Sequence, residues 1–166
     1  LFHGGCVRVS GVLPAGGQNI TGDLAIGLRV PTATAERLKV ERAVALASMA
    51  AEDEEILIPG ETASGTTVRT QIVAAIVEPR CEEIFTMVKE AVAADPGFDS
   101  MGGGVVLTGG GSKLAGMTGV AGQVFDLPVR RGAPLGYEGL AELVEDERWS
   151  TAAGLLRYEA ERTAGE

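Results

Sequence analysis

The sequence predicts an α/β fold in which short strands alternate with helices. Apolar residues make up 45% of the 166 residues but aromatic residues only 4%, so the core has to be built from Val, Leu, Ile and Ala, as in α/β layers. β-branched runs alternate with segments whose apolar residues recur at helical spacing. Glycine-rich turns follow two of the expected strands and lead into helices, and such turns let a ligand approach the backbone closely.

Periodicity and turn residues place the elements of the first half. Gly4-Gly5 forms the turn of a hairpin, Pro31 ends a helix, and Thr32 or Thr34 caps the next helix. In order, we expect strands 1–2 and 6–13, helices 20–28 and 32–51, strand 54–59 and a polar loop at 60–65.

The second half repeats the alternation. Pro79 should kink a long helix or mark a junction, and Asp95-Pro96-Gly97 ends that helix. Ser112 and Ser150 are expected as N-caps, and Trp149 is expected to anchor the last helix in the core. In order, we expect helix 66–94, strand 105–108, helix 112–124, strand 127–130, a loop at 131–146 and helix 150–159.

The net charge of −9 argues against two classes of partner. Phosphates of nucleic acids and anionic bilayers repel an acidic chain, so we expect no nucleic-acid partner and no electrostatic membrane binding. Cys6 and Cys81 fit free thiols in a reducing compartment, and no cysteine spacing suggests a metal site. The chain does not begin with methionine, and we expect it to be a segment of a longer protein.

Several motifs recur together along the chain. They are Gly16-Gly17-x-x-x-Thr21-x-Asp23 within residues 16–29, and the stretches 35–39, 76–84, 105–116, 128–131 and 149–156. Their order and spacing resemble the actin-like ATPase superfamily of actin, large heat-shock chaperones and sugar kinases. Within it, the chain is most similar to the FtsA family of bacterial cell-division proteins.

The resemblance implies an incomplete actin-like ATPase (ribonuclease H-like) lobe, with a mixed sheet flanked by helices and a smaller helix-rich outer subdomain. Residues 1–31 and 95–166 would form the inner subdomain with the adenosine-binding turn, and residues 32–94 the outer one. This sequence lacks the family's Asp-x-Gly-Gly-Gly-Thr phosphate loops and its C-terminal amphipathic membrane helix. We therefore expect it to correspond to the C-terminal part of such a protein.

The resemblance also implies a nucleotide site. Glu36 would accept hydrogen bonds from the ribose, and the stem of Lys39 would cover the base while its ammonium stays in water. The residues themselves leave alternatives open. Glu36 and Lys39 could be an ordinary surface ion pair, Thr21 and Asp23 could cap and charge a helix, and both glycine turns could be structural connections only. The implied residues are Gly16 and Gly17 near the phosphates, Glu36 and Lys39, and Gly109, Gly110, Gly111 and Ser112 against adenine and ribose.

The resemblance also implies a partner-binding site at Arg80 and Glu83. These residues lie on a helix of the subdomain that, in the family, binds the FtsZ C-terminal tail. A surface ion pair along one helix is the alternative. The resemblance also implies self-association into filaments and contacts with other division proteins. We expect a cytoplasmic location at the division site, peripheral to the inner face of the cell membrane. Only a segment outside this sequence would contact the membrane.

The expected cofactor is ATP with Mg, whose magnesium ligands lie outside this sequence. We nominate no catalytic residue, and we expect at most weak ATPase activity from the full-length protein and none from this segment. A metabolic kinase of the same superfamily, acting on a sugar or acetate, is the alternative function. A Rossmann-type dinucleotide binder is disfavoured because no G-x-G-x-x-G follows a first strand with an acidic residue at the required distance.

Overall fold

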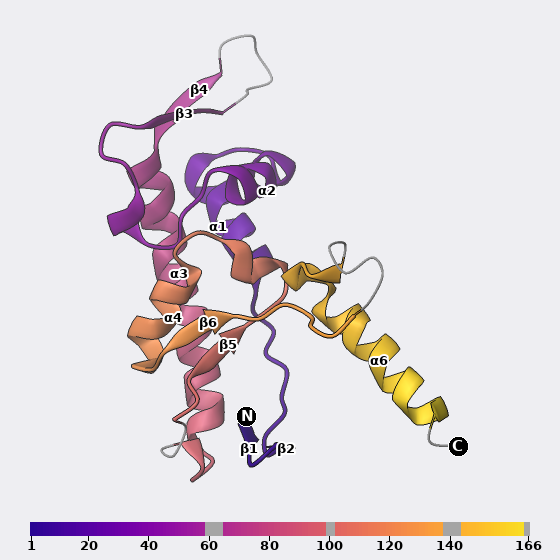
Figure 1. The fold of residues 1–166 in the computed structure, drawn as a ribbon. Helices are drawn as coiled ribbons and strands as arrows, with labels where there is room; N and C mark the ends of the chain where they lie inside the picture. The colour runs from indigo at the N-terminus through magenta and orange to yellow at the C-terminus, as the bar shows by residue number, and fades with distance from the viewer. Residues whose placement is uncertain (59–64, 99–101, 138–143, 165–166) are drawn as a thin grey trace.

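The α/β class is confirmed by the computed structural model, which describes residues 1–58, 65–98, 102–137 and 144–164 (Figure 1). The helices are α1 (Gly17–Leu28), α2 (Thr32–Glu41), α3 (Thr70–Ala93), α4 (Met117–Phe125) and α6 (Ser150–Ala164), with 3-10 turns η1 (Ala47–Met49), η3 (Gly110–Lys113) and η4 (Glu147–Trp149). The strands are β1 (Phe2–His3), β2 (Cys6–Val7), β3 (Glu55–Ile58), β4 (Thr66–Arg69), β5 (Val105–Leu107) and β6 (Val129–Arg131).

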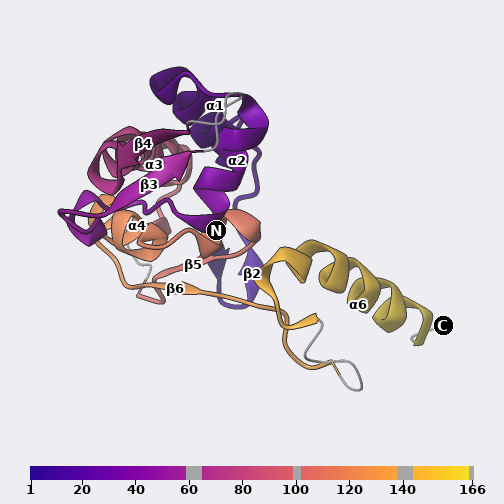
Figure 2. The same cartoon turned by 90° about the horizontal axis from the view of Figure 1, so that it is seen from above.

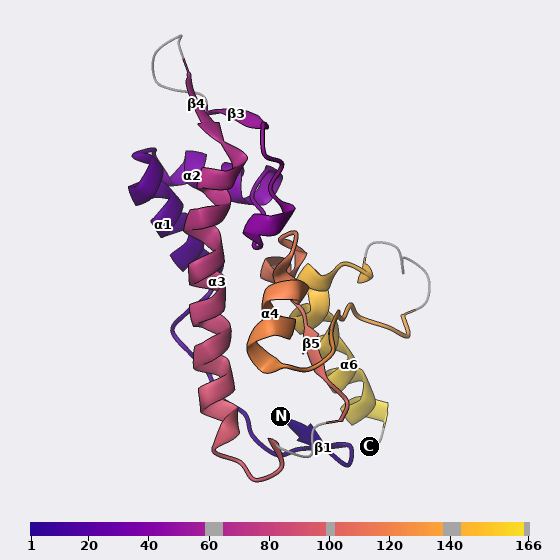
Figure 3. The same cartoon turned by 90° about the vertical axis from the view of Figure 1, so that its left-hand side faces the viewer.

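Helix α3 is the long central helix, and α1 and α4 pack against it (Figures 1 and 3). Val73, Val77, Cys81 and Phe85 recur every four residues, which puts them on one face of α3, and all are buried. The ring of Phe85 meets that of Phe125 on α4 edge to face, with centroids 6.3 Å apart. Pro79, which was expected to kink a long helix or mark a junction, lies inside α3, so the junction alternative is wrong.

Within the described residues, the strands pair two by two. Strands β1–β2 and β3–β4 are antiparallel, and β5–β6 is parallel, with Val105 opposite Val129. Helix α4 joins β5 to β6 and covers them, as a parallel crossover requires. Gly104 has φ +74°, and a Cβ there would stand 2.3 Å from the carbonyl oxygen of Pro128, so only glycine lets β5 begin this close to the segment before β6.

The core is continuous across the expected subdomain boundary. Ile20 and Leu24 of α1 are buried in the same cluster as the α3 face and as Val120 and Phe125 of α4. The two-part division of the chain stays a prediction.

The expected helix over residues 32–51 is wrong beyond Glu41. Residues 43–45 are not helical, because Val44 forms a parallel bridge with Ala115 and the Ala45 N–H donates to the Ala115 carbonyl oxygen at 2.7 Å. Pro31, and neither Thr32 nor Thr34, is the N-cap residue of α2.

Three further expectations are also corrected. Residues 66–69 form strand β4 and not the start of a helix, because they pair with β3. The segment expected as helix 112–124 begins with the 3-10 turn η3, and α4 starts only at Met117, after Gly116 adopts φ +83°. The Ser112 hydroxyl donates to the Gly109 carbonyl oxygen, so it is not an N-cap acceptor. The expected loop at 60–65 lies largely outside the described residues.

Helix α6 extends away from the packed helices (Figures 1 and 2). Ala153 is buried, and the Tyr137 hydroxyl donates to its carbonyl oxygen at 2.5 Å. Trp149 is 49% exposed, so the expectation that it anchors this helix in the core is wrong. The Ser150 hydroxyl donates to the Glu147 carbonyl oxygen instead of capping α6 as an acceptor. None of the described helices is both long and apolar enough to cross a membrane.

Candidate functional site

The two glycine turns, although far apart in the sequence, line one open pocket of about 780 Å³ between α1, α2 and η3. Of the predicted residues, the pocket includes Gly17, Glu36, Lys39, Gly110 and Gly111. Its other lining residues are Ile20, Val40, Glu41, Arg42, Ala43, Val44, Lys113, Leu114, Ala115 and Arg148.

The remaining predicted residues support the walls of this pocket. The N–H of Gly16 donates to the Asn19 carboxamide oxygen at 2.9 Å and holds the start of α1. Gly109 takes φ +82°, which turns the chain from β5 into η3. Ser112 is buried and ties its hydroxyl back to Gly109 at 2.7 Å.

A hydrogen-bonded cluster joins α1 to α2 at the pocket wall. The Lys39 ammonium donates to the Gly17 carbonyl oxygen at 3.1 Å, to Thr21 Oγ1 at 2.9 Å and to Glu36 Oε2 at 2.7 Å. The Thr21 hydroxyl lies 2.5 Å from the same Glu36 oxygen. The ammonium of Lys39 is thus engaged with protein atoms, contrary to the expectation that it stays in water, and its side chain is only 14% exposed.

This cluster favours the ionised form of Glu36. The Lys39 ammonium, followed by the Thr21 hydroxyl, lowers the pKa of the Glu36 carboxyl below its ordinary value of 4.5. The Glu36 side chain is 42% exposed and faces the pocket. A partly exposed carboxylate with fixed orientation is suited to accept hydrogen bonds from hydroxyl groups of a ligand.

The opposite side of the pocket carries positive charge that the sequence did not single out. Lys113 and Arg148 line it, and both donate to Asp146, at 2.6 Å and 3.0 Å. Arg148 and then Lys113 hold the pKa of the Asp146 carboxyl well below its usual range. A Cβ at Gly110 would lie 3.4 Å from Arg148 Cγ, so this glycine is in ordinary contact distance of the arginine stem. No sequence signal marked Asp146, because it follows a stretch with no helical or strand periodicity.

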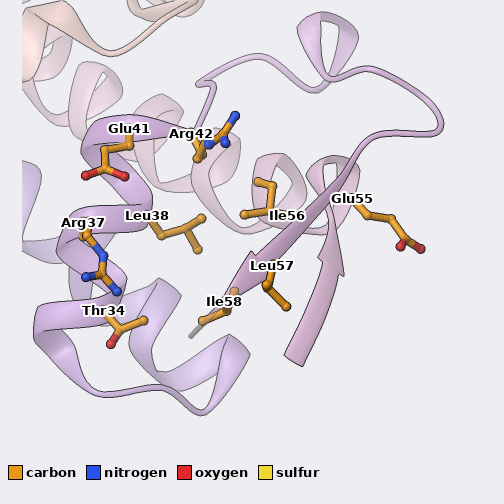
Figure 4. A pocket seen from close by; sticks show the side chains of 9 residues that line it. All are labelled: Thr34, Arg37, Leu38, Glu41, Arg42, Glu55, Ile56, Leu57 and Ile58. Carbon is orange, nitrogen blue, oxygen red and sulfur yellow. The ribbon is translucent and has the colours of Figure 1, made fainter. Parts of the chain in front are cut away.

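A second pocket, of about 510 Å³, lies between α2 and β3 and was not expected from the sequence (Figure 4). Leu38, Ile56 and Ile58 form its apolar floor, and all three are buried. Arg37 and Arg42 stand on its helical side. It contains none of the predicted site residues.

Arg80 forms ion pairs with two carboxylates of its own chain. Its Nε and Nη2 donate to the two carboxylate oxygens of Asp23 on α1, at 2.5 Å and 3.2 Å, and its Nη1 donates to Glu83 one turn further along α3. Asp23, which the sequence left as a possible helix-charging residue, is therefore the partner of Arg80. Both side chains are 29% exposed. Within the described residues, no group of three or more potential ligands is arranged to hold a metal ion.

Comparison with known proteins gives a family. The sequence model described as "Cell division protein FtsA" matches residues 1–154. The chain is 39% identical over 160 residues to cell division protein FtsA of Pseudomonas aeruginosa, covering 95% of this chain and 38% of that protein. It is 33% identical over 168 residues to the Escherichia coli K12 protein of the same name, covering 95% and 40%. The chain therefore spans about 40% of the length of these curated relatives.

A solved structure with a similar fold is MreB 5 of Spiroplasma citri bound to AMPPNP. The TM-score is 0.70 at 16% identity, and the match covers 97% of this chain and 48% of that one. At this identity the likeness concerns the fold alone. The expected actin-like fold is confirmed.

Proposed function

Because the chain belongs to the FtsA family of cell-division proteins, we propose that its larger pocket holds the adenosine of a nucleotide. The observation that carries the proposal is that residues of the two glycine turns, which are far apart in the sequence, line one pocket together with Glu36. The MreB structure, whose fold is similar, is bound to the ATP analogue AMPPNP, which supports the same class of ligand.

In this proposal each wall of the pocket has its own role. Gly110 and Gly111 leave room for the base, because neither has a side chain to fill the pocket. The Glu36 carboxylate accepts hydrogen bonds from the ribose. Gly17, at the start of α1, lies toward the phosphates, and the N–H groups of a helix N-terminus favour negative charge.

The supporting residues fit the same proposal. Gly16 and Gly109 shape the two turns, and Ser112 fixes the second. Lys39 holds Glu36 in place instead of covering the base with a free ammonium. The magnesium that accompanies ATP would be bound by residues outside this sequence.

We further propose that residues 1–31 with 95–166 and residues 32–94 are the inner and outer subdomains of the full-length protein. In it, they would support filament assembly, contacts with other division proteins and binding of the FtsZ C-terminal tail near Arg80 and Glu83. The full-length protein would act at the division site, peripheral to the inner face of the cell membrane.

Calorimetric titration of the full-length protein with Mg-ATP tests the nucleotide site. Glu36→Gln removes the charge but keeps the shape, and it should weaken ATP about tenfold, the effect of losing one hydrogen bond to a charged group. Glu82→Gln, on the exposed side of α3, is the matched control and should bind as the parent does. Equal ATP affinity of Glu36→Gln and the parent would contradict the ribose assignment, and no binding by the parent would contradict the site as a whole.

A further inference from the structure

Thr21 is a polar residue with no exposed surface at the wall of the larger pocket. A hydroxyl has one hydrogen to donate, and the contact at 2.5 Å directs it to Glu36 Oε2, while Lys39 donates to the hydroxyl oxygen at 2.9 Å. The Gly17 carbonyl oxygen, 3.1 Å from the hydroxyl, receives its bond from Lys39 at the same distance. Thr21 and Lys39 therefore converge on one oxygen of the Glu36 carboxylate.

This convergence decides which oxygen faces a ligand. The hydrogen bonds from Thr21 and Lys39 both end on Oε2 of the carboxylate, at 2.5 Å and 2.7 Å. Rotation of the carboxylate about its Cγ–Cδ bond would move Oε2 away from both donors, so the two bonds oppose that rotation and leave Oε1 for a ligand. That oxygen has its lone pairs free to accept a hydroxyl of a sugar.

We propose that Thr21 is a positioning residue that gives the pocket its preference for a ribose over a deoxyribose. The inference rests on the proposed nucleotide site and adds the group that makes Glu36 selective. A preorganised acceptor distinguishes ligands that differ by one hydroxyl, because the ligand without that hydroxyl leaves the acceptor unpaired. The expected preference is about tenfold or more, as for other hydrogen bonds to a charged group.

The hydroxyl, and not the volume of the side chain, carries the effect. Thr21→Val keeps the branched shape and removes the oxygen, whereas Thr21→Ser keeps the oxygen. In Thr21→Val, Lys39 still reaches Glu36 and Gly17, so the link between α1 and α2 persists while one of the two bonds that orient the carboxylate is lost. Thr70 supplies a matched control, because it is also buried and its hydroxyl donates to the Ala51 carbonyl oxygen, outside the pocket.

The test compares the affinities of ATP, 2′-deoxy-ATP and 3′-deoxy-ATP for the full-length protein by calorimetry. The parent, Thr21→Ser and Thr70→Val should prefer ATP about tenfold over at least one deoxy analogue, and Thr21→Val should bind the three nucleotides within about twofold of each other. Thr21→Ala gives the same comparison if Thr21→Val does not fold.

Three results would overturn the inference. If Thr21→Val weakens all three nucleotides by the same factor, Thr21 has only a structural role. If the parent binds the three equally, the selectivity does not exist, although the nucleotide site stands. If the parent binds none of them, the inference is overturned together with the proposed function.

Discussion

Asp23 on α1 and Arg80 on α3 are joined by two hydrogen bonds, Nε to Oδ2 at 2.5 Å and Nη2 to Oδ1 at 3.2 Å, across 57 residues of sequence. The guanidinium of Arg80 thus forms a bidentate interaction with a carboxylate of its own chain. Its third hydrogen bond goes to Glu83. A partner carboxylate at Arg80 would have to replace Asp23 or bind beside it.

This pairing sharpens the test of the proposed partner site. Arg80→Glu should weaken capture of an FtsZ tail peptide, because it removes the cation and leaves three acids together. Asp23→Asn should keep or strengthen capture, because it releases the guanidinium. Fluorescence anisotropy with a labelled peptide measures both. If Asp23→Asn weakens capture as much as Arg80→Glu does, Arg80 only holds α1 against α3, and the partner assignment is wrong.

Gly110→Val should abolish nucleotide binding by the full-length protein without unfolding it. The new Cβ would lie at ordinary contact distance from Arg148, so the fold tolerates it, while the branched side chain occupies the pocket. Gly154→Val on α6 is the control, because a Cβ there meets no atom within 4 Å and the residue lies outside the pocket. Circular dichroism checks folding and calorimetry checks binding. ATP binding by Gly110→Val at the parental affinity would reject the adenosine assignment.

The lowered pKa of Glu36 predicts a dependence of stability on pH. A carboxyl whose pKa is lower in the folded state stabilises the fold above its ordinary pKa of 4.5, and this contribution is lost as the pH falls through the folded-state pKa. The parent should therefore exceed Glu36→Gln in free energy of unfolding at pH 7, and the difference should shrink below pH 4.5. Urea denaturation at several pH values measures it. A difference that does not change with pH would show that Lys39 and Thr21 do not stabilise the ionised form.

Cys81 should be inert while the chain is folded. Burial, with smaller contributions from Glu78 and Glu82, raises the pKa of its thiol to about 12, whereas Cys6 is exposed. A disulfide reagent at pH 8 should label one thiol per native chain and two in denaturant. Cys6→Ser should remove the native labelling. Rapid labelling of the native Cys6→Ser variant would mean that the α3 face is open to solvent.

The packing of α1 makes a prediction about its two faces. Leu24 has no exposed surface, and Leu24→Ala should lower the free energy of unfolding by about 2–5 kcal/mol, since the cavity cannot close completely. Ile26 on the same helix is 79% exposed, and Ile26→Ala should change it by less than about 0.5 kcal/mol. Urea denaturation compares the two. Similar losses for both variants would contradict the orientation of α1.

The sequence predicted most elements whose pattern is local. The positions of α1, β3, β5 and β6 follow from apolar runs and from the turns that bound them. The end of α2 at Glu41 does not, because it is set by the bridge between Val44 and Ala115, some seventy residues away. Residues 66–69 were misassigned for the same reason, since only pairing with β3 makes them a strand.

In the candidate site, too, the locally patterned residues could be predicted from the sequence, whereas those that depend on tertiary packing could not. The glycine turns and the spacing of Glu36 and Lys39 are visible in the sequence, and the structure brings members of both groups to one pocket. Thr21 was noticed only as a possible cap, because its burial against α2 depends on the packing of two helices. Lys113 lies in the motif stretch 105–116 but is not among the predicted site residues, and Arg148 lies outside the motifs. Both pair with Asp146 only in the folded chain.

Helix α6 has a practical consequence for anyone who purifies this chain by itself. Leu155, Leu156 and Tyr158 are each about two-thirds exposed on a helix that stands away from the other helices (Figure 2). Apolar side chains grouped in this way favour adhesion between molecules. The apparent molecular mass from light scattering should therefore rise with protein concentration. A mild detergent, or the change of these residues to Gln, should make the apparent mass independent of concentration.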